Sequence, residues 1–551
     1  MKKKLILVAI IVLATLVRIY DLGGNRPHLT NDEAALGYNA YSLLHTARDE
    51  HGSLLPVVFK SFGDWKPGFY VYTTVPTVAL FGLTEFSTRL PSALFGILAV
   101  FLVYLLVKRL TENETIALFS SFFLAVSPWH ITFSRGAWEA NISLTLTLAA
   151  LVALLTYLNN AKKKYIILSA VLFALTLWAY QSAKLFSLLL IVGVGIVYRQ
   201  EILSVNKKHF LLAGVAGAII SIPIIISLVM GHAGRLNVMS VFSNARSDQY
   251  IEDTITSQGD DGNGLAFSLF HSEEYNFMRG ILGRYFNHFA GRFLFFEGDW
   301  TNARHTSPNI GYLLLLDAPL LLLGLVYGAK HFNKKEFQFL FYYLAVSPLA
   351  SAFSRDSVHG IRALNMVIPL VIYVAIGAAY VFGKLKQYKR VTYLLSPIVI
   401  GVYVFNFVFF LDSYFIHAPF KDSQNFLYGY KQVVELITPD QSSHDEIVVD
   451  DNFDQAYIYF LFYQQYEPAI YQKTNNFKES RLGDVGKITQ LDNITFRPIN
   501  WSADKQQTGL VMVNREINMP MYEIENNADY KLTKIPYLDG SPGFVIVEVV
   551  R

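Results

Sequence analysis

Cysteine is absent from this 551-residue sequence, and charged residues are scarce. Without cysteine the chain can form no disulfide, thiolate metal site or cysteine nucleophile. Charged residues make up 16% of the chain, whereas soluble globular proteins contain about 25%. Together with a hydrophobic content of 53%, this predicts a polytopic membrane protein. The net charge of +3 is too small to indicate a nucleic-acid partner.

The sequence also lacks the short motifs of common nucleotide-binding and hydrolase sites. It contains no P-loop, no Rossmann glycine pattern and no serine-nucleophile elbow. No internal repeat or low-complexity segment stands out. The apolar N-terminus is not followed by a small-residue cleavage site, so we interpret it as a retained membrane span and not as a signal peptide.

Apolar runs and the basic residues between them predict the topology. A span needs roughly 20 apolar residues, and short loops rich in lysine and arginine stay cytoplasmic. The lysines at 2–4 therefore keep the N-terminus inside, and the first span, near 5–20, leads to the outer face. A crossing at 68–83 would invert every later basic loop, so we expect an interfacial or re-entrant helix there.

The predicted fold is mainly α-helical, with about 11 membrane spans and a small α/β domain. After the first span, crossings are expected near 90–107, 115–131, 141–158, 165–180, 185–198, 210–230, 311–329, 336–353, 363–383 and 391–411. The odd count places the C-terminus outside. We divide the chain into a transmembrane domain, 1–411, with large outer loops at 21–89 and 231–310, and an extracytoplasmic domain, 412–551.

Short apolar segments near 446, 509 and 543 predict the strands of the extracytoplasmic domain. The expected location of the whole chain is a plasma (inner) membrane of the bacterial type. Its N-terminus is expected to be cytoplasmic and its C-terminal domain extracytoplasmic, because the basic loops alternate with the apolar runs.

Two adjacent carboxylates, Asp32 and Glu33, follow the first span on its outer side. Together with Thr30 they are typical of a capped helix N-terminus with acidic first-turn residues, a structural role that is compatible with a catalytic one. A partly desolvated carboxylate here could take a proton from an acceptor hydroxyl. Lys66 precedes Pro67 and is either a snorkelling interfacial lysine or a cation for a lipid-borne phosphate.

A second outer turn contains Arg135 and Glu139 at i, i+4 spacing. A helix-surface ion pair would explain this spacing, but the topology places the turn on the same face as Asp32, which favours a functional role. The outer turn at 354–362 adds His359 and Arg362. An ordinary polar loop and a phosphate contact fit these two residues equally well.

A third outer region precedes the apolar run at 311–329. It contains Glu297, Asp299 and His305, whose side chains are of the types that ligate metal ions. Their spacing matches no tight metal site. The sequence therefore identifies no certain cofactor and leaves a divalent metal open, with Asp299 and His305 as candidates.

The motifs of the first 160 residues together resemble the GT-C membrane glycosyltransferases, most closely the protein O-mannosyltransferases and the lipid A aminoarabinose transferases. The motifs are Asp32-Glu33, Lys66-Pro67, LFGLTEFSTRLPSALFG at 80–96 and Ser134-Arg135-x-x-x-Glu139. A looser likeness continues through Arg-His-x-x-Pro-x-x-Gly-Tyr at 304–312 and His-x-x-Arg at 359–362. Only one proline follows Lys66, where relatives often have two. The Trp-Trp-Asp signature of oligosaccharyltransferases is absent, so en bloc transfer to asparagine is not expected.

The resemblance implies a glycosyltransferase that uses a polyprenyl-phosphate sugar as donor. It implies that Asp32 is the general base or orients the acceptor, with Glu33 beside it. The expected site residues are Asp32, Glu33 and Glu139 for catalysis, and Lys66, Arg135, His359 and Arg362 for the donor phosphate. The implied acceptor is a lipid, a glycan or a protein at the outer face.

Two other functions stay open on the residues alone. A lipid-linked glycan transporter or flippase would show charged or Gly/Pro-broken segments at mid-membrane in paired halves, whereas here the polar residues gather at one face. A polymerase or ligase with a diphosphate-linked donor would share the topology and the cations. It would not specifically share the Asp-Glu and Lys-Pro pattern.

Overall fold

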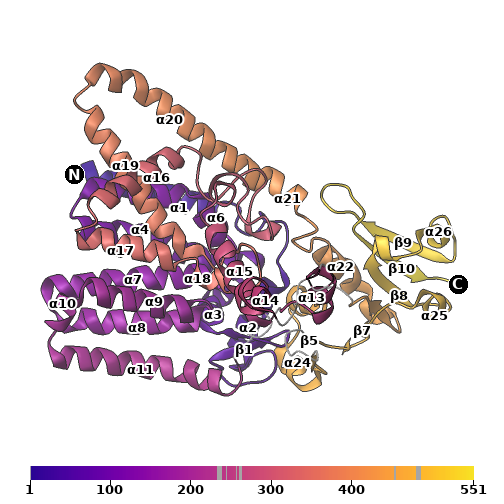
Figure 1. Ribbon diagram of the computed structural model, residues 1–551. Coiled ribbons are helices and arrows are strands. Elements are labelled where there is room, and N and C mark those ends of the chain that lie inside the picture. The colour runs from indigo at the N-terminus through magenta and orange to yellow at the C-terminus, as the bar shows by residue number, and fades with distance from the viewer. Residues whose placement is uncertain are drawn as a thin grey trace.

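The structure is a computed structural model that describes residues 2–232, 239–243, 245–255, 257, 259, 264–451, 455–479 and 486–551. A bundle of helices forms one part, and a mixed α/β part that carries the C-terminus lies beyond one end of the bundle (Figure 1). The N-terminus lies at the opposite end of the bundle. The two chain ends are therefore separated along the direction of the helices.

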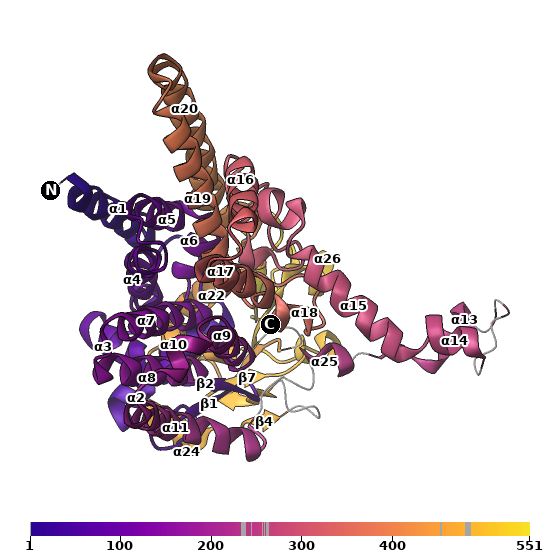
Figure 2. The same ribbon diagram turned by 60° about the vertical axis from the view of Figure 1, so that its left-hand side comes forward.

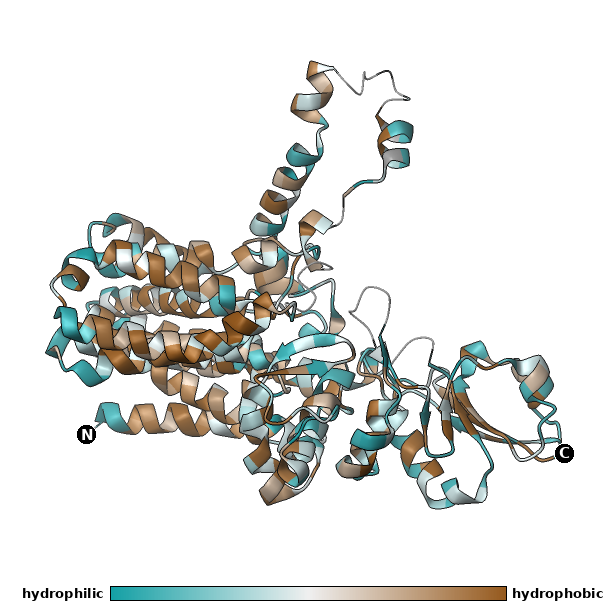
Figure 3. Ribbon diagram, turned by 90° about the horizontal axis from the view of Figure 1, so that it is seen from below, coloured by the Kyte–Doolittle hydropathy of each residue, from teal (hydrophilic) through white to brown (hydrophobic). Residues whose placement is uncertain are grey.

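The bundle is built from apolar helices that run side by side. They are α1 (Lys2–Ile19), α4 (Glu85–Thr111), α5 (Glu114–Val126), α6 (Pro128–Ser134), α7 (Glu139–Asn160), α8 (Lys163–Ala179), α9 (Ala183–Val197), α11 (Lys207–Val229), α16 (Asp317–Lys330), α17 (Lys335–Val346), α19 (Val367–Leu385) and α20 (Lys389–Asp412). Figure 3 shows hydrophobic residues along these helices and hydrophilic residues at their ends. Among the described residues, five helices are long and apolar enough to cross a membrane, or six if the bent pair α5–α6 is one span.

The mainly helical fold with a small C-terminal β region is confirmed, and the count of about 11 spans stays a prediction. Four of the expected spans are short helices. They are α8, α9, α16 and α17, with 17, 15, 14 and 12 residues. At about 1.5 Å per residue, such helices need flanking residues to cross a hydrocarbon core of about 30 Å. Hydropathy along the chain detects the apolar run but not where the helix breaks.

The first outer loop folds into α2 (Asn31–Thr46), the hairpin of β1 (Val58–Ser61) and β2 (Asp64–Pro67), and α3 (Phe69–Phe81). The predicted cap is confirmed, because Thr30 Oγ1 accepts the Glu33 N–H at 3.3 Å and Glu33 Oε2 accepts the Thr30 N–H at 3.0 Å. With 13 residues, α3 is too short to cross a membrane alone. Two expected spans, α16 and α17, are of similar length, so the interfacial or re-entrant helix expected at 68–83 stays a prediction.

The second large outer loop, predicted at 231–310, contains α13 (Asp248–Thr254), α14 (Leu265–Phe270) and α15 (Glu273–Asn287) in its described part. Residues 233–238 and 260–263 lie outside the described residues. Helix α15 projects away from the bundle (Figure 2). It is joined to α17 through Tyr285, whose Oη donates to the Ala345 carbonyl at 2.9 Å.

The C-terminal part contains a six-stranded sheet in the order β6-β7-β3-β8-β10-β9. Its strands are β3 (Ile447–Val449), β6 (Gln490–Leu491), β7 (Ile494–Phe496), β8 (Val511–Arg515), β9 (Tyr530–Ile535) and β10 (Phe544–Val549). Strand β3 pairs in parallel with β7 and β8, and the remaining pairs are antiparallel. The strands predicted near 446, 509 and 543 are confirmed as β3, β8 and β10.

The C-terminal part shares a hydrophobic core with the first outer loop. Apolar residues of α2, of α23 (Tyr457–Tyr463) and of the sheet form one buried cluster. The Lys431 N–H donates to His28 Nε2 at 3.0 Å, and Tyr459 Oη donates to the Leu29 carbonyl at 3.2 Å. The C-terminal part therefore packs against the loop that leads into α2. The predicted domain boundary at 411/412 stays a prediction.

Glu50 is a fully buried carboxyl between α2 and β1. Its Oε1 accepts the Asn39 side-chain amide at 3.0 Å, and its N–H donates to Asn39 Oδ1 at 3.0 Å. Burial raises the pKa of Glu50 to about 8, because the hydrogen bond from Asn39 only partly opposes it. Between its ordinary pKa and this value, the folded protein holds a proton that the unfolded chain has lost. Stability is therefore expected to fall as the pH rises through this window.

The variant Glu50→Gln should remove this contribution. As the pH rises from about 5 to about 8, the midpoint of thermal unfolding in detergent should fall in the wild type. The midpoint of Glu50→Gln should fall by less over the same range. Glu112→Gln, at an exposed carboxylate, is the matched control and should follow the wild type. Equal pH profiles for Glu50→Gln and wild type would show that Glu50 is ionised in the folded protein at neutral pH.

Candidate active site

Asp32, in the first turn of α2, forms an ion pair with Lys66 on β2. The Asp32 side chain is 51% exposed and the Lys66 side chain only 16%. Burial acts to lower the pKa of Lys66, but the charges of Asp32 and Glu139 outweigh it, so the pKa is raised and Lys66 stays a cation. The pair therefore offers a carboxylate that solvent and a substrate can reach, held beside a fixed positive charge.

One further predicted residue, Glu139, lies within electrostatic range of this pair, and a second, Arg362, is connected to it through Tyr180. Glu139, the first residue of α7, interacts with Lys66 and Asp32. Tyr180, which follows α8, interacts with Arg362, Glu139 and Asp32. The structure thus brings four of the seven predicted site residues into one neighbourhood at the ends of α2, α7 and α8.

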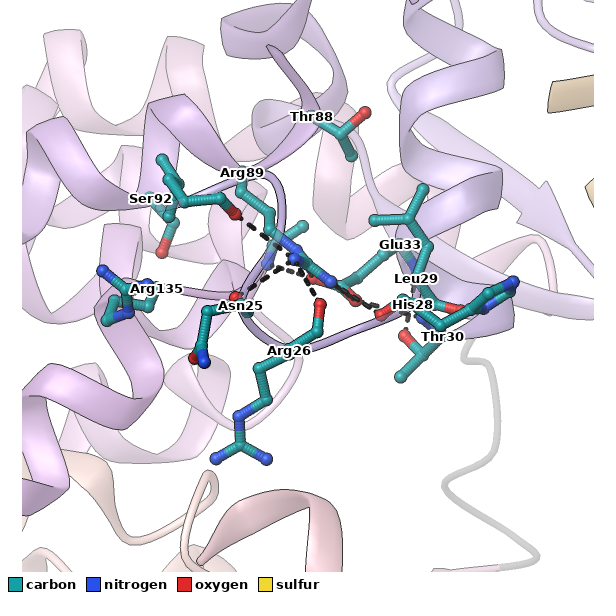
Figure 4. Close-up of polar contacts among 12 residues, drawn as sticks. Asn25, Arg26, His28, Leu29, Thr30, Glu33, Thr88, Arg89, Ser92 and Arg135 are labelled. Carbon is teal, nitrogen blue, oxygen red and sulfur yellow. Dashed lines mark hydrogen bonds and ion pairs between the residues drawn. The ribbon is translucent and has the colours of Figure 1, made fainter. Parts of the chain in front are cut away.

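Glu33 is buried, with 3% of its surface exposed, and points into the protein (Figure 4). Its Oε1 accepts Arg89 Nε at 3.0 Å and the Ala137 N–H at 2.9 Å, and its Oε2 accepts Arg89 Nη2 at 3.3 Å. Burial acts to raise the pKa of Glu33, but the charge and hydrogen bonds of Arg89, together with the N–H groups of Ala137 and Thr30, outweigh it, so the pKa is lowered. Both carboxylate oxygens are occupied, so the contacts of Glu33 are those of a group that joins α2 to α4 and to the turn before α7.

Arg89 also holds the chain between α1 and α2. Its guanidinium donates to the carbonyls of Leu22 at 3.3 Å, Arg26 at 3.1 Å and His28 at 2.7 Å (Figure 4). Arg89 was not among the predicted site residues, although it lies within the motif at 80–96. The pairing with Glu33 spans 56 positions, and no local spacing signals such a contact.

Arg135 is fully buried near the end of α1. Its Nη1 donates to the Val17 carbonyl at 2.8 Å and its Nη2 to the Asp21 carbonyl at 3.3 Å. Its guanidinium lies 4.6 Å from the centroid of the Phe415 ring. These contacts satisfy carbonyls at a helix C-terminus, and the predicted contact of Arg135 with a donor phosphate stays a prediction.

The two metal-ligand candidates of the sequence meet His359 in a second cluster. Asp299 Oδ2 contacts His305 Nδ1 at 2.8 Å, and the His305 and His359 ring centroids are 4.9 Å apart. One potential ligand atom of each of the three residues lies within 4.8 Å of the others. Glu297 lies apart from this cluster in an ion pair with Arg292, at 2.6 Å.

An apolar cavity of about 730 Å³ lies between α8, α9 and α11. Its lining is almost entirely aliphatic and includes one cation, Lys184, in the first turn of α9. Lys184 Nζ donates to Gln181 Oε1, and Gln181 Nε2 donates to the Trp65 carbonyl at 2.6 Å. Hydrogen bonds therefore link the cation of the cavity to the residue beside Lys66. Sequence analysis missed Lys184 and Gln181, because a polar residue at the end of an apolar run is also typical of an ordinary span boundary.

Residues 8–241 match the family model described as dolichyl-phosphate-mannose-protein mannosyltransferase. ArnT from Cupriavidus metallidurans, in its structure bound to undecaprenyl phosphate, aligns with 98% of this chain and 97% of its own at 12% identity, with a TM-score of 0.54. The oligosaccharyltransferase from Archaeoglobus fulgidus, in complex with Zn and sulfate, aligns with 83% of this chain at 14% identity and a TM-score of 0.50. This chain covers 61% of that oligosaccharyltransferase. No curated protein matches the chain.

The fold is that of the GT-C membrane glycosyltransferases. The family match over the first outer loop and the likeness to ArnT along the whole chain agree with each other. They confirm, at the level of this class, the resemblance to polyprenyl-phosphate-dependent glycosyltransferases that the sequence predicted.

The Glu33–Arg89 pair should be essential for stability. Arg89→Met leaves the Glu33 carboxylate buried without its partner, at an expected cost of about 3–5 kcal/mol. The double variant Glu33→Gln/Arg89→Met leaves no unpaired charge and should be more stable than Arg89→Met alone. Thermal unfolding in detergent measures both effects.

The exposed ion pair Lys335–Glu201 serves as the control for this measurement. Lys335→Met should cost less than about 1 kcal/mol, because water already solvates both charges. An Arg89→Met variant as stable as Lys335→Met would contradict the structural role of the buried pair.

Proposed function

We propose that the protein transfers a monosaccharide from a polyprenyl-phosphate donor to an acceptor hydroxyl at the outer face of the membrane. The observation that carries the proposal is the Asp32–Lys66 pair beside an apolar cavity. The cation of that cavity, Lys184, is joined through Gln181 to the carbonyl of Trp65, the residue before Lys66. A polyprenyl phosphate has a long apolar chain and an anionic head group. A cavity with aliphatic walls and a cation at its end complements both parts.

In this proposal the prenyl chain occupies the cavity between α8, α9 and α11, and the phosphate lies between Lys184 and Lys66. Lysine binds phosphate as a point charge. The likeness to ArnT, whose structure contains undecaprenyl phosphate, supports a lipid phosphate as the donor carrier. Arg362 lies within electrostatic range of the same neighbourhood and adds positive charge there.

Asp32 acts as the general base. It takes the proton of the acceptor hydroxyl while the hydroxyl oxygen forms a bond to the anomeric carbon of the sugar, with inversion. The bond from that carbon to the phosphate oxygen breaks, and its electron pair leaves with the polyprenyl phosphate. The phosphate gains negative charge in this step, so Lys66 and Lys184 bind the transition state more strongly than the ground state.

The other predicted residues take supporting roles in this mechanism. Glu139 lies near enough to Asp32 and Lys66 to orient a hydroxyl of the sugar or of the acceptor. Glu33 positions Asp32 by holding the first turn of α2 against α4. Arg135 lies in the turn that leads to Glu139 and adds positive charge there. The proposed mechanism does not require it to contact the phosphate.

The orientation is part of the proposal. The site and the C-terminal part lie at one end of the bundle, and the lysines that follow the N-terminal methionine lie at the other (Figure 1). Lysines of this kind favour the cytoplasmic side. We therefore infer that residues 1–411 form the membrane domain and that residues 412–551 form an extracytoplasmic domain over the site.

Asp32→Asn tests the general base. The substitution keeps the size of the side chain but removes its ability to accept a proton, and a loss of about 10²–10⁴ in kcat is expected. The measurement is the release of polyprenyl phosphate from a panel of synthetic polyprenyl-phosphate sugars, with membrane extract as the source of acceptor. Asp21→Asn, at an exposed carboxylate of the same outer loop, is the matched control and should keep wild-type turnover. Full turnover by a folded Asp32→Asn protein would remove Asp32 from this role.

Gly214→Trp tests the cavity. Gly214 lines it, and a Cβ added there meets no atom within 4 Å, so the backbone at this position accepts a side chain that can extend into the cavity. We expect the KM for a long-chain donor to rise by about tenfold or more, while a donor with a short prenyl chain keeps its kcat/KM. The control is Val215→Trp, at a neighbouring residue of α11 that is 48% exposed. Equal effects of Gly214→Trp on both donors would place the prenyl chain elsewhere.

A further inference from the structure

We propose that Asp299, His305 and His359 hold a divalent transition-metal ion of the Zn²⁺ type. This site is distinct from the Asp32–Lys66 pair, and its existence does not depend on the proposed transfer reaction. Asp299 and His305 come from the segment between α15 and α16, and His359 comes from the turn before α19. The fold brings these two segments together at the outer end of the bundle.

The three side chains converge closely enough to share one ion. Asp299 Oδ2 and His305 Nδ1 are 2.8 Å apart, and one potential ligand atom of each residue lies within 4.8 Å of the other two. In a Zn²⁺ site, bonds of about 2.0–2.2 Å to nitrogen and oxygen separate neighbouring ligand atoms by about 3 Å. A shift of each side chain by roughly 1 Å or less would therefore bring all three ligand atoms to bonding distance of one ion, and a water molecule would supply the fourth position of a tetrahedral site.

The ligand types of the cluster also suit a metal of this type. One carboxylate and two imidazole rings converge on one point, and all three side chains are largely shielded from water. Neutral imidazole and carboxylate are ligands for Zn²⁺, whereas Mg²⁺ and Ca²⁺ prefer sites built from oxygen alone.

The backbone around the cluster is held in place before any ion binds. The Gly360 N–H donates to Asp299 Oδ2 at 2.8 Å, and the Gly360 carbonyl accepts Trp129 Nε1 at 3.0 Å. A Cβ at position 360 would lie 1.8 Å from Tyr312 Oη, so only glycine fits. Tyr312 Oη in turn donates to the His305 carbonyl at 3.1 Å. These bonds fix the ligand-bearing segments relative to each other.

The position of the cluster indicates what a bound ion would do. The His305 ring packs against Trp138, with centroids 5.4 Å apart, and Trp138 precedes Glu139 of the proposed active site. Arg362 lies on the same turn as His359, three residues on. A metal that joins the two segments would fix the position of Arg362 relative to the turn at Trp138. The three ligands therefore act as positioning residues for the transferase site.

The test measures metal content and metal affinity directly. The full-length protein, purified in detergent through a histidine-free tag, is analysed for bound metals, treated with a chelator and titrated with Zn²⁺ by calorimetry. We expect one Zn²⁺ per chain, and a loss of measurable binding in His305→Ala and His359→Ala. His331→Ala, at a histidine that stacks on Tyr327 at the end of α16, should bind Zn²⁺ as the wild type does.

Further variants separate a metal site from a folding defect and from the reaction itself. His359→Gln keeps a polar side chain of similar size, and should elute from a sizing column at the same volume as the wild type without binding Zn²⁺. Asp32→Asn should lose turnover and retain Zn²⁺, so a failure of the transfer mechanism leaves this test intact. A wild-type protein that binds no Zn²⁺ after chelation, or a His305→Ala/His359→Ala variant that binds it with unchanged affinity, would overturn the proposal.

Discussion

The buried ion pair between Glu33 and Arg89 is the interaction on which the rest of this structure depends. Both charges are removed from water, which costs several kcal/mol per ion unless each is fully paired and hydrogen-bonded. The fold meets this requirement with four donors on the Glu33 carboxylate and with backbone carbonyls around the Arg89 guanidinium. The same contacts join α2, α4, the end of α1 and the turn before α7.

This pair also determines the difference between two neighbouring carboxylates. Successive residues of a helix point about 100° apart, so Asp32 and Glu33 cannot face the same side. Because Arg89 draws Glu33 into the protein, Asp32 projects outward, where it meets Lys66 of the hairpin. One acidic residue is thereby used for structure, and its neighbour is left accessible for chemistry.

The proposed site lies where three regions of the chain meet. The first outer loop supplies Asp32 and Lys66, the bundle supplies Glu139 and the apolar cavity, and the C-terminal part packs on α2 through a shared hydrophobic core. The proposed metal cluster contacts the bundle part of this region through His305, whose ring centroid lies 5.4 Å from that of Trp138.

Much of this organisation follows from the sequence alone. Hydropathy and the placement of lysine and arginine identify a membrane protein whose polar residues gather at one face, because apolar runs and flanking charges act locally. The Thr30 cap and strands β3, β8 and β10 follow from neighbouring residues in the same way. Only the tertiary structure decided that Glu33 pairs with Arg89, that Gln181 joins Lys184 to Trp65, and that His359 meets Asp299. Each of these contacts joins elements that are distant in the chain, and it forms only because the packing of whole helices brings their ends together.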